Sequence, residues 1–216
     1  MNVELNEVEC RVLGCLIEKE NTTPDYYPLT LNALTNACNQ KSNREPVVDY
    51  SEEWVEQALD SLREKNLVYV LYGSGSRTAK YKHLALKYFE LKLPEIAVLC
   101  VLLVRGSQTL GEFNQRTSRI YEFSGLDEIN QTVEGLIRRE TPLIVKLPKQ
   151  PGQKEVRYAH LLSGEINLEN IVSTAPTSNF QAKNERVEKL EEKVESLESE
   201  LNEFREEFKE FKKQFE

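Results

Sequence analysis

The feature that most constrains this chain is an internal repeat, because two copies of one pattern must adopt one fold twice. Four segments recur in the same order in both halves, and only the lengths between them differ. The matching segments are 8–16 with 96–104, 30–34 with 109–113, 59–62 with 133–136, and 81–84 with 158–161. The chain is therefore expected to contain two similar domains in tandem.

Three helices are predicted in the first copy from the spacing of apolar residues and from capping residues. Asn6 and Glu9 have the capping-box spacing at the start of the first helix. Pro24 cannot continue that helix, so a loop follows. Thr30 is placed to cap a second helix, and Ser51 to cap a third with two glutamates in its first turn.

The second copy carries the same signals at the same points. Pro94 suits the first position of a helix. Thr109 and Glu112 form a second capping box, and Ser124 and Asp127 repeat that spacing before a third helix. The two copies therefore predict the same three-helix order.

Each copy ends in a predicted β-hairpin. Residues 67–72 and 79–84 are rich in β-branched and aromatic residues around a glycine–serine turn, and 143–147 and 155–161 flank a second turn. Three helices closed by a hairpin are the winged-helix plan. The predicted fold class is mainly α with small β-hairpins (α+β): one winged-helix domain over residues 1–90 and a second over 91–163.

The C-terminal part of the chain predicts a coiled coil. Residues 164–183 are polar and aperiodic, which indicates a linker. Over residues 184–216, apolar side chains recur at alternating steps of three and four, a heptad pattern. They are Val187, Leu190, Val194, Leu197, Leu201, Phe204, Phe208, Phe211 and Phe215.

The charges beside these heptads predict a parallel homodimer. Every g position faces an e position of opposite sign in a parallel pair: Arg186–Glu191, Lys193–Glu198, Glu200–Arg205 and Glu207–Lys212. The alternative is a single amphipathic helix that folds back on the domains, and the sequence leaves it open.

Charge and hydropathy restrict what the chain can bind. The net charge is −8, with −4 over residues 1–90, +1 over 91–183 and −5 over 184–216, so nucleic acid can be bound only through local basic patches. The longest apolar run, 96–104, is too short for a membrane span. The N-terminus has no signal-peptide pattern, and a cytoplasmic location without membrane contact is expected.

The cysteines and histidines predict no metal site and no catalytic centre. Cys10, Cys15, Cys38 and Cys100 form no C-x-x-C pair and lie among apolar neighbours, as expected for buried thiols in a reducing compartment. His83 and His160 occupy matching repeat positions, which favours a shared packing role. No cofactor, metal or enzymatic activity is expected.

The third helices are poor candidates for reading DNA bases. In the first copy this helix carries five acids, Glu52, Glu53, Glu56, Asp60 and Glu64, against Arg63 and Lys65. Carboxylates facing phosphates are repulsive, and a reading helix usually carries arginine, lysine, asparagine or glutamine.

The candidate nucleic-acid-binding residues therefore lie outside the third helices. They come from the wings and from the ends of the second helices: Arg77, Lys80, Lys82, Lys146, Lys149, Lys154, Arg157, Arg116, Arg119, Asn39, Gln40, Lys41, Asn43 and Arg44. Such groups suit phosphates, which position a protein without reading sequence. The competing interpretations are that the lysines are ordinary solvated strand edges and that the segment 39–44 only ends a helix.

Several segments also resemble a known family. Residues 9–19, 27–34 and 38–44 in the first half, and 94–100 and 108–112 in the second, are similar to the YceH-like family of uncharacterised bacterial proteins. The resemblance covers residues 4–162 and extends to a coiled-coil tail. It implies tandem winged-helix domains and brings no catalytic residues.

Two functional hypotheses follow from the sequence. The first is a dimeric DNA-associated regulator or architectural factor that contacts phosphates through basic wings. The second is a protein-interaction adaptor in which acidic third helices and apolar grooves bind another protein. The acidic balance favours the adaptor and the fold-level analogy favours DNA, although a fold alone does not specify a function.

Overall fold

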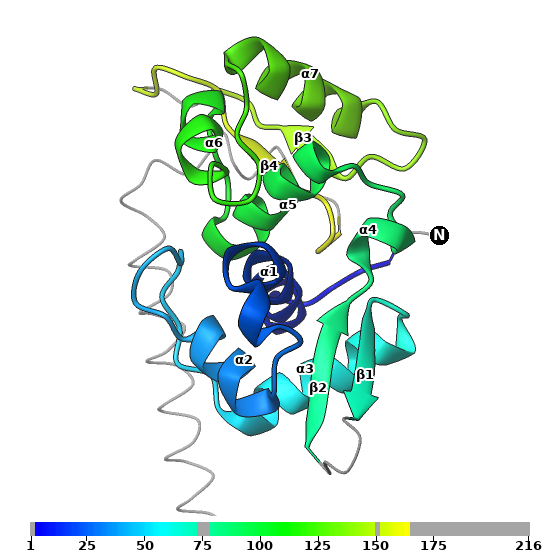
Figure 1. Ribbon diagram of the computed structural model, residues 1–216. Coiled ribbons are helices and arrows are strands. Elements are labelled where there is room, and N and C mark those ends of the chain that lie inside the picture. The colour runs from blue at the N-terminus through cyan, green and yellow to red at the C-terminus, as the bar shows by residue number, and fades with distance from the viewer. Residues whose placement is uncertain (1–2, 73–77, 150–151, 165–216) are drawn as a thin grey trace, which may run out of the picture. The chain divides into compact units, whose positions relative to one another are not determined.

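The computed structural model describes residues 3–72, 78–149 and 152–164, which form a mixed α/β protein (Figure 1). The first copy consists of α1 (Glu7–Thr22), a 3-10 turn η1 (Pro24–Tyr26), α2 (Leu31–Cys38), α3 (Glu52–Glu64), β1 (Val68–Tyr72) and β2 (Ala79–His83). The short α4 (Ala85–Tyr88) leads to the second copy: α5 (Leu93–Arg105), α6 (Leu110–Arg116), α7 (Leu126–Ile137), β3 (Ile144–Lys146) and β4 (Tyr158–His160). The predicted order of three helices and a hairpin is thus present twice.

Most of the predicted helix starts are confirmed. The Asn6 side chain accepts from the Glu9 amide at 2.9 Å, and Glu9 accepts from the Asn6 amide at 2.8 Å. Thr109 and Glu112 form the same reciprocal pair at the start of α6. Ser51 accepts from the Trp54 amide at 3.3 Å. These bonds satisfy amides that the first turn of each helix leaves unpaired.

The predicted capping pair at Ser124 and Asp127 is wrong by one residue. α7 begins at Leu126, so Gly125 occupies the cap position and makes no side-chain cap bond. Glu128, the third helical residue, reaches back instead, and its Oε2 accepts from both the amide and the hydroxyl of Ser124 at 2.8 Å. The short elements η1 and α4 were not predicted from the sequence.

The two hairpins have equivalent pairings. β1 and β2 pair antiparallel from Val68 opposite His83 to Tyr72 opposite Ala79, and β3 and β4 pair with Ile144 opposite His160. In each copy one further residue, just before the second helix, pairs with the second strand of the hairpin, β2 or β4. Leu29 exchanges backbone hydrogen bonds with Tyr81, and Gln108 does so with Tyr158. This third pairing confirms the repeat at the level of the backbone.

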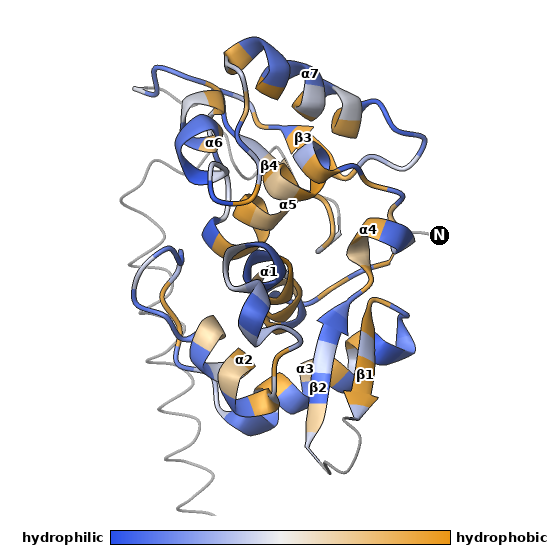
Figure 2. Cartoon of the chain, viewed as in Figure 1, coloured by the Kyte–Doolittle hydropathy of each residue, from blue (hydrophilic) through white to orange (hydrophobic). Residues whose placement is uncertain are grey.

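The core is built around α1 and α5. Every residue from 9 to 17 on α1 and from 96 to 104 on α5 is buried, so the middle of each helix is enclosed on all sides. Figure 2 shows both helices at the centre, with α5 and the far turns of α1 hydrophobic and the near end of α1 hydrophilic. The buried residues of both copies belong to one cluster, so the two repeats share a core.

The two central helices approach each other closely at Gly14. A Cβ atom on Gly14 would lie 2.8 Å from both Leu103 Cβ and Val104 Cγ1. The Cys100 thiol donates to the Gly14 carbonyl at 3.4 Å, and the Glu45 amide donates to the Val104 carbonyl at 3.0 Å. A glycine is needed here because any side chain would separate α1 from α5.

The prediction that the cysteines are buried thiols is confirmed. Cys10, Cys15, Cys38 and Cys100 are all free and buried. Burial raises the pKa of the Cys10 thiol to about 11 and raises that of Cys100 well above its usual range. These two thiols are therefore protonated at neutral pH and act as small apolar groups.

The two histidines occupy equivalent positions, each at the end of the second strand of its hairpin, but their polar surroundings differ. His83 Nε2 lies 2.7 Å from Glu20 Oε2, and its Nδ1 accepts from the Ala85 amide at 3.2 Å. Hydrogen bonding to His83 lowers the pKa of Glu20. His160 Nδ1 is buried without a hydrogen-bond partner among the described residues. The shared position therefore does not bring a shared hydrogen-bonding role.

We expect Gly14→Ala to destabilise the protein by about 1–3 kcal/mol, because the new methyl group must displace the backbone-proximal Leu103 Cβ. The control is Gly135→Ala in α7, where a Cβ meets nothing within 4 Å. That change should stabilise the protein by about 0.5–1 kcal/mol through helix propensity. Urea unfolding of the full chain measures both values. Equal stability of Gly14→Ala and the parent would contradict the close packing of α1 on α5.

We expect folding to weaken with acid through His160. Burial lowers its pKa from 6.5 to about 4, so between these values the unfolded chain binds a proton that the folded chain does not. Stability is therefore present above pH 6.5 and lost as the pH falls toward 4, by about 2 kcal/mol between pH 7 and pH 5. His160→Leu should remove this part of the pH dependence in urea unfolding curves. An unchanged difference between pH 7 and pH 5 in that variant would contradict the assignment.

Candidate nucleic-acid interface

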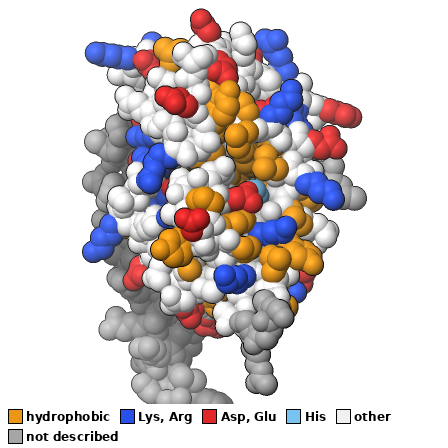
Figure 3. Space-filling view, viewed as in Figure 1, with side chains coloured by type: hydrophobic (Ala, Val, Ile, Leu, Met, Phe, Trp, Pro, Cys, Tyr) orange, Lys and Arg blue, Asp and Glu red, His pale blue; other side chains and the backbone are white. Residues whose placement is uncertain are grey.

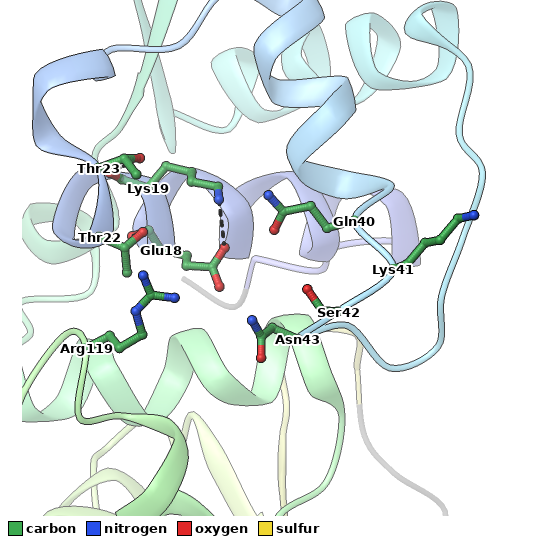
Figure 4. Close-up of a pocket in the computed structure, with 9 residues that line it drawn as sticks. All are labelled: Glu18, Lys19, Thr22, Thr23, Gln40, Lys41, Ser42, Asn43 and Arg119. Carbon is green, nitrogen blue, oxygen red and sulfur yellow. Dashed lines mark hydrogen bonds and ion pairs between the residues drawn. The ribbon is translucent and has the colours of Figure 1, made fainter.

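A basic cleft forms where the end of α1 meets the loop after α2 and the segment between α6 and α7 (Figure 4). Its volume is about 420 Å³, and it is open to solvent. It is lined by Glu18, Lys19, Thr22, Thr23, Gln40, Lys41, Ser42, Asn43 and Arg119. The cleft thus combines candidate residues that lie far apart in the sequence and belong to different copies of the repeat.

Arg119 is the cation that the second copy contributes to this cleft. Figure 4 shows its guanidinium directed toward Thr22 and Glu18 of α1, across from Asn43. Lys19 Nζ lies 3.8 Å from Glu18 Oε2 on the same side, a long ion pair. Lys41 points away from the other lining residues and into solvent. Arg119 and Lys19 are therefore the cations best placed to meet a ligand inside the cleft.

Two of the predicted binding residues have structural roles beneath the cleft. Arg44 is buried and donates to Glu18 Oε2 at 2.6 Å and to the Ala37 carbonyl at 3.0 Å. Burial lowers the pKa of Arg44, but its hydrogen bonds to Glu18 outweigh that effect and raise it. Asn39 uses both ends of its amide to bond the backbone of Tyr50 at 2.8 Å. Both residues hold the 39–50 loop in place.

A smaller adjoining pocket, of about 160 Å³, contains two more arginines. Arg105, at the end of α5, donates to Asn43 Oδ1, and Arg116, in α6, donates to Gln108 Oε1. Burial and the nearby Arg116 cation lower the pKa of Arg105. Cations held this close repel one another, so an anion bound among them would relieve that repulsion.

Glu112 pairs both with Arg116 of this pocket and with Arg157 of the second hairpin. Arg157 donates to Glu112 at 3.2 Å and to the Ser107 carbonyl at 2.6 Å, and Arg116 lies 3.5 Å from the same carboxylate. Burial raises the pKa of Glu112, but the Thr109 amide and the two arginines outweigh it, and the pKa lies below its usual value. Arg157 and Arg116 are therefore largely committed to internal partners.

The lysines of the hairpins are the most accessible of the predicted residues. Lys146, Lys149 and Lys154 are exposed on the second hairpin, as is Lys80 on the first. Lys82 lies over the Tyr69 ring, 5.8 Å from its centroid. On the face shown in Figure 3, hydrophobic and basic side chains lie next to each other over the β1–β2 hairpin. Arg77, between these strands, lies outside the described residues.

The third helix of the first copy has the charge that the sequence predicts. All five of its acids, Glu52, Glu53, Glu56, Asp60 and Glu64, are exposed. Its two basic residues are already paired: Arg63 with Asp60 at 2.8 Å, and Lys65 with the buried Glu9 at 2.7 Å. The exposed face of α3 therefore repels phosphate.

Lys19 lines the basic cleft and Arg105 lines the adjoining pocket, and neither was predicted from the sequence as a binding residue. Each lies in the last turn of a central helix, where a basic residue is usually explained by the helix dipole. Only the packing of α1 on α5 brings them beside Arg119. The helix ends that meet here carry partial negative charge, so any bound anion depends on the cationic side chains rather than on backbone amides.

Within residues 3–72, 78–149 and 152–164, no group of three or more histidine, cysteine or acidic residues is arranged to hold a metal ion. None of the helices in those same ranges is long and apolar enough to cross a membrane.

Comparison with known proteins places this mixed α/β chain in a family. A family model described as "Protein of unknown function, DUF480" matches residues 5–153. A "UPF0502 protein" of Geotalea uraniireducens is 50% identical over 195 residues, which cover 88% of this chain and 89% of the relative. One from Opitutus terrae is 53% identical over 165 residues (76% and 72%), and one from Vibrio campbellii is 48% identical over 198 residues (88% and 90%).

The chain therefore belongs to the DUF480/UPF0502 family of uncharacterised bacterial proteins. This result confirms the family resemblance found in the sequence.

Proposed function

We propose that this chain is a tandem winged-helix protein that binds duplex DNA through backbone phosphates, with its hairpins as the contacting wings. The order of three helices and a hairpin in each copy supports the winged-helix assignment. The third backbone pairing, at Leu29 in one copy and Gln108 in the other, supports it further, because it adds a short strand beside each hairpin.

The observation that carries the DNA proposal is the exposure of lysines on both hairpins. Four of these lysines form no ion pair with the described residues, so their charge is available to a polyanion: Lys80, Lys146, Lys149 and Lys154. Tyr69 and Tyr72 are 54% and 69% exposed beside the lysines of the first hairpin. Tyrosine hydroxyls and lysines are common phosphate donors.

The acidic face of α3 sets the mode of contact. A winged-helix protein usually inserts its third helix into the major groove. Here the exposed carboxylates of that helix oppose such insertion, whereas the hairpins and the Arg119 cleft carry the positive charge. Contact is therefore led by phosphates, and little base sequence is read.

We expect the full chain to bind a labelled mixed-sequence duplex with steep salt dependence in fluorescence anisotropy. Lys149→Gln with Lys154→Gln should weaken binding and reduce the log–log salt slope by about 0.9 for each lost phosphate contact. The matched control is Lys87→Gln with Lys92→Gln, which removes the same charge from exposed positions outside the hairpins. Equal losses in the two double variants, or no binding at low salt, would refute wing-led DNA contact.

We also propose that residues 184–216 pair two copies as a parallel coiled coil, which would double the number of wings available to one duplex. The residues of this heptad pattern, from Val187 to Phe215, lie outside the described residues. The proposal rests on the unbroken apolar seam and on the four g–e pairs of opposite charge.

Leu197→Lys should convert the protein from twice the chain mass of 25.0 kDa to the mass of one chain in sedimentation equilibrium, because it places a charge in the apolar seam. Ser199→Lys adds the same charge at an outer heptad position and should leave the dimer intact. A single-chain mass for the unmodified protein would favour the alternative, a helix that folds back on the domains.

A further inference from the structure

The acidic third helix of the first copy also carries the only tryptophan of the chain, and that side chain is exposed. Trp54 is 55% exposed, although a large aromatic side chain in a small domain is normally covered. Beside it, the start of α1 and α3 form a shallow groove of about 360 Å³. The groove is lined by Asn6, Val8, Glu9, Trp54, Gln57, Ala58 and Ser61.

Trp54 is held in a defined position. One side of its ring packs on Tyr50, with the ring centroids 6.0 Å apart and the planes at 46°. Tyr50 is in turn fixed by the two backbone bonds from the Asn39 side chain. The backbone of Trp54 is fixed by the cap bond to Ser51. A rigid, partly covered aromatic ring loses little freedom when a partner packs on it, as is typical of interface anchor residues.

The rim of the groove is acidic. By helical spacing, Glu53, Asp60 and Glu64 fall on the side of α3 next to Gln57 and Ser61, and all three are exposed. Glu7, in the first turn of α1, is also exposed. Arg63 and Lys65 are paired with Asp60 and Glu9, and Arg11 is buried and donates to backbone carbonyls. The groove therefore presents the apolar side chains of Val8, Trp54 and Ala58 beside the exposed carboxylates of Glu7, Glu53 and Glu64.

We propose that this Trp54 groove docks a short basic segment of a partner protein, in which arginine or lysine flanks an apolar side chain. The volume holds only a few side chains, so a peptide segment fits better than a folded surface. The acidic rim complements arginine or lysine, and the exposed indole face can stack on a guanidinium. Nucleic acid is repelled by the same rim. The heptad segment 184–216, with twelve acids and seven bases, has the wrong sign to cover it.

The single tryptophan makes the proposal directly measurable, because all tryptophan emission comes from the groove. The probe is a short peptide of alternating arginine and leucine, added to the full-length protein. Its binding should shift the emission of Trp54 to the blue as the ring leaves water. The same peptide with glutamate in place of arginine, or with glycine in place of leucine, should produce no shift.

Variants then separate the groove from general charge attraction. Followed by anisotropy of the labelled peptide, Trp54→Ala should weaken binding by at least roughly tenfold. Glu53→Gln with Glu64→Gln should weaken it several-fold and reduce its salt dependence. Glu122→Gln with Asp127→Asn removes two exposed acids from the second copy and should have no effect. Duplex DNA binding by Trp54→Ala should equal that of the parent, because the hairpin lysines are untouched.

Four outcomes would overturn the proposal. They are an unshifted emission maximum with the arginine–leucine peptide, an equal shift with the glutamate peptide, a blue shift on adding duplex DNA, and an emission already typical of a buried indole in the free protein. The last would mean that another part of the chain or a second copy covers Trp54. The peptide titrations and the emission of the free protein do not depend on whether the hairpins bind DNA, so the two proposals can fail separately.

Discussion

The contact on which the rest of the structure depends is the close crossing of α1 and α5 at Gly14. Because no side chain separates the helices there, the backbones approach until the Cys100 thiol reaches the Gly14 carbonyl. Two copies of one fold thereby bury their central helices against each other and share a core. The basic cleft follows from this crossing, since it alone brings Arg119 and Arg105 of the second copy beside Lys19 and Asn43 of the first.

Local features of the fold could be predicted from the sequence, while the packing between the copies could not. The capping pairs at Asn6 and Thr109 are local, because donor and acceptor lie three residues apart and the chain itself brings them together. At Ser124 the same rule failed by one residue, because α7 begins at Leu126 and its third residue is Glu128 rather than Asp127. A capping pattern in the sequence thus does not fix the exact first residue of a helix.

The candidate cations could be predicted from the sequence, but whether each is free to bind a ligand could not. Arg44, Arg116 and Arg157 have the same charge as Lys149 in the sequence, yet they are bound to Glu18, Gln108 and Glu112 inside the protein. Arginine is suited to such buried roles because its planar fork can meet a carboxylate and several carbonyls at once, whereas lysine keeps its ammonium in water. The exposed lysines therefore carry the proposed DNA contact, and the arginines mainly build the surface that presents them.

The helix α1 also separates two surfaces of opposite charge. Its first residues border the acidic Trp54 groove, and its last turn lines the basic cleft. A helix of sixteen residues is about 24 Å long, whereas charges in physiological salt are screened over about 8 Å. The two fields are thus nearly independent, and the net charge of −8 is no measure of either surface. A chain that is acidic as a whole can in this way present a basic cleft at one end of α1 and an acidic groove at the other.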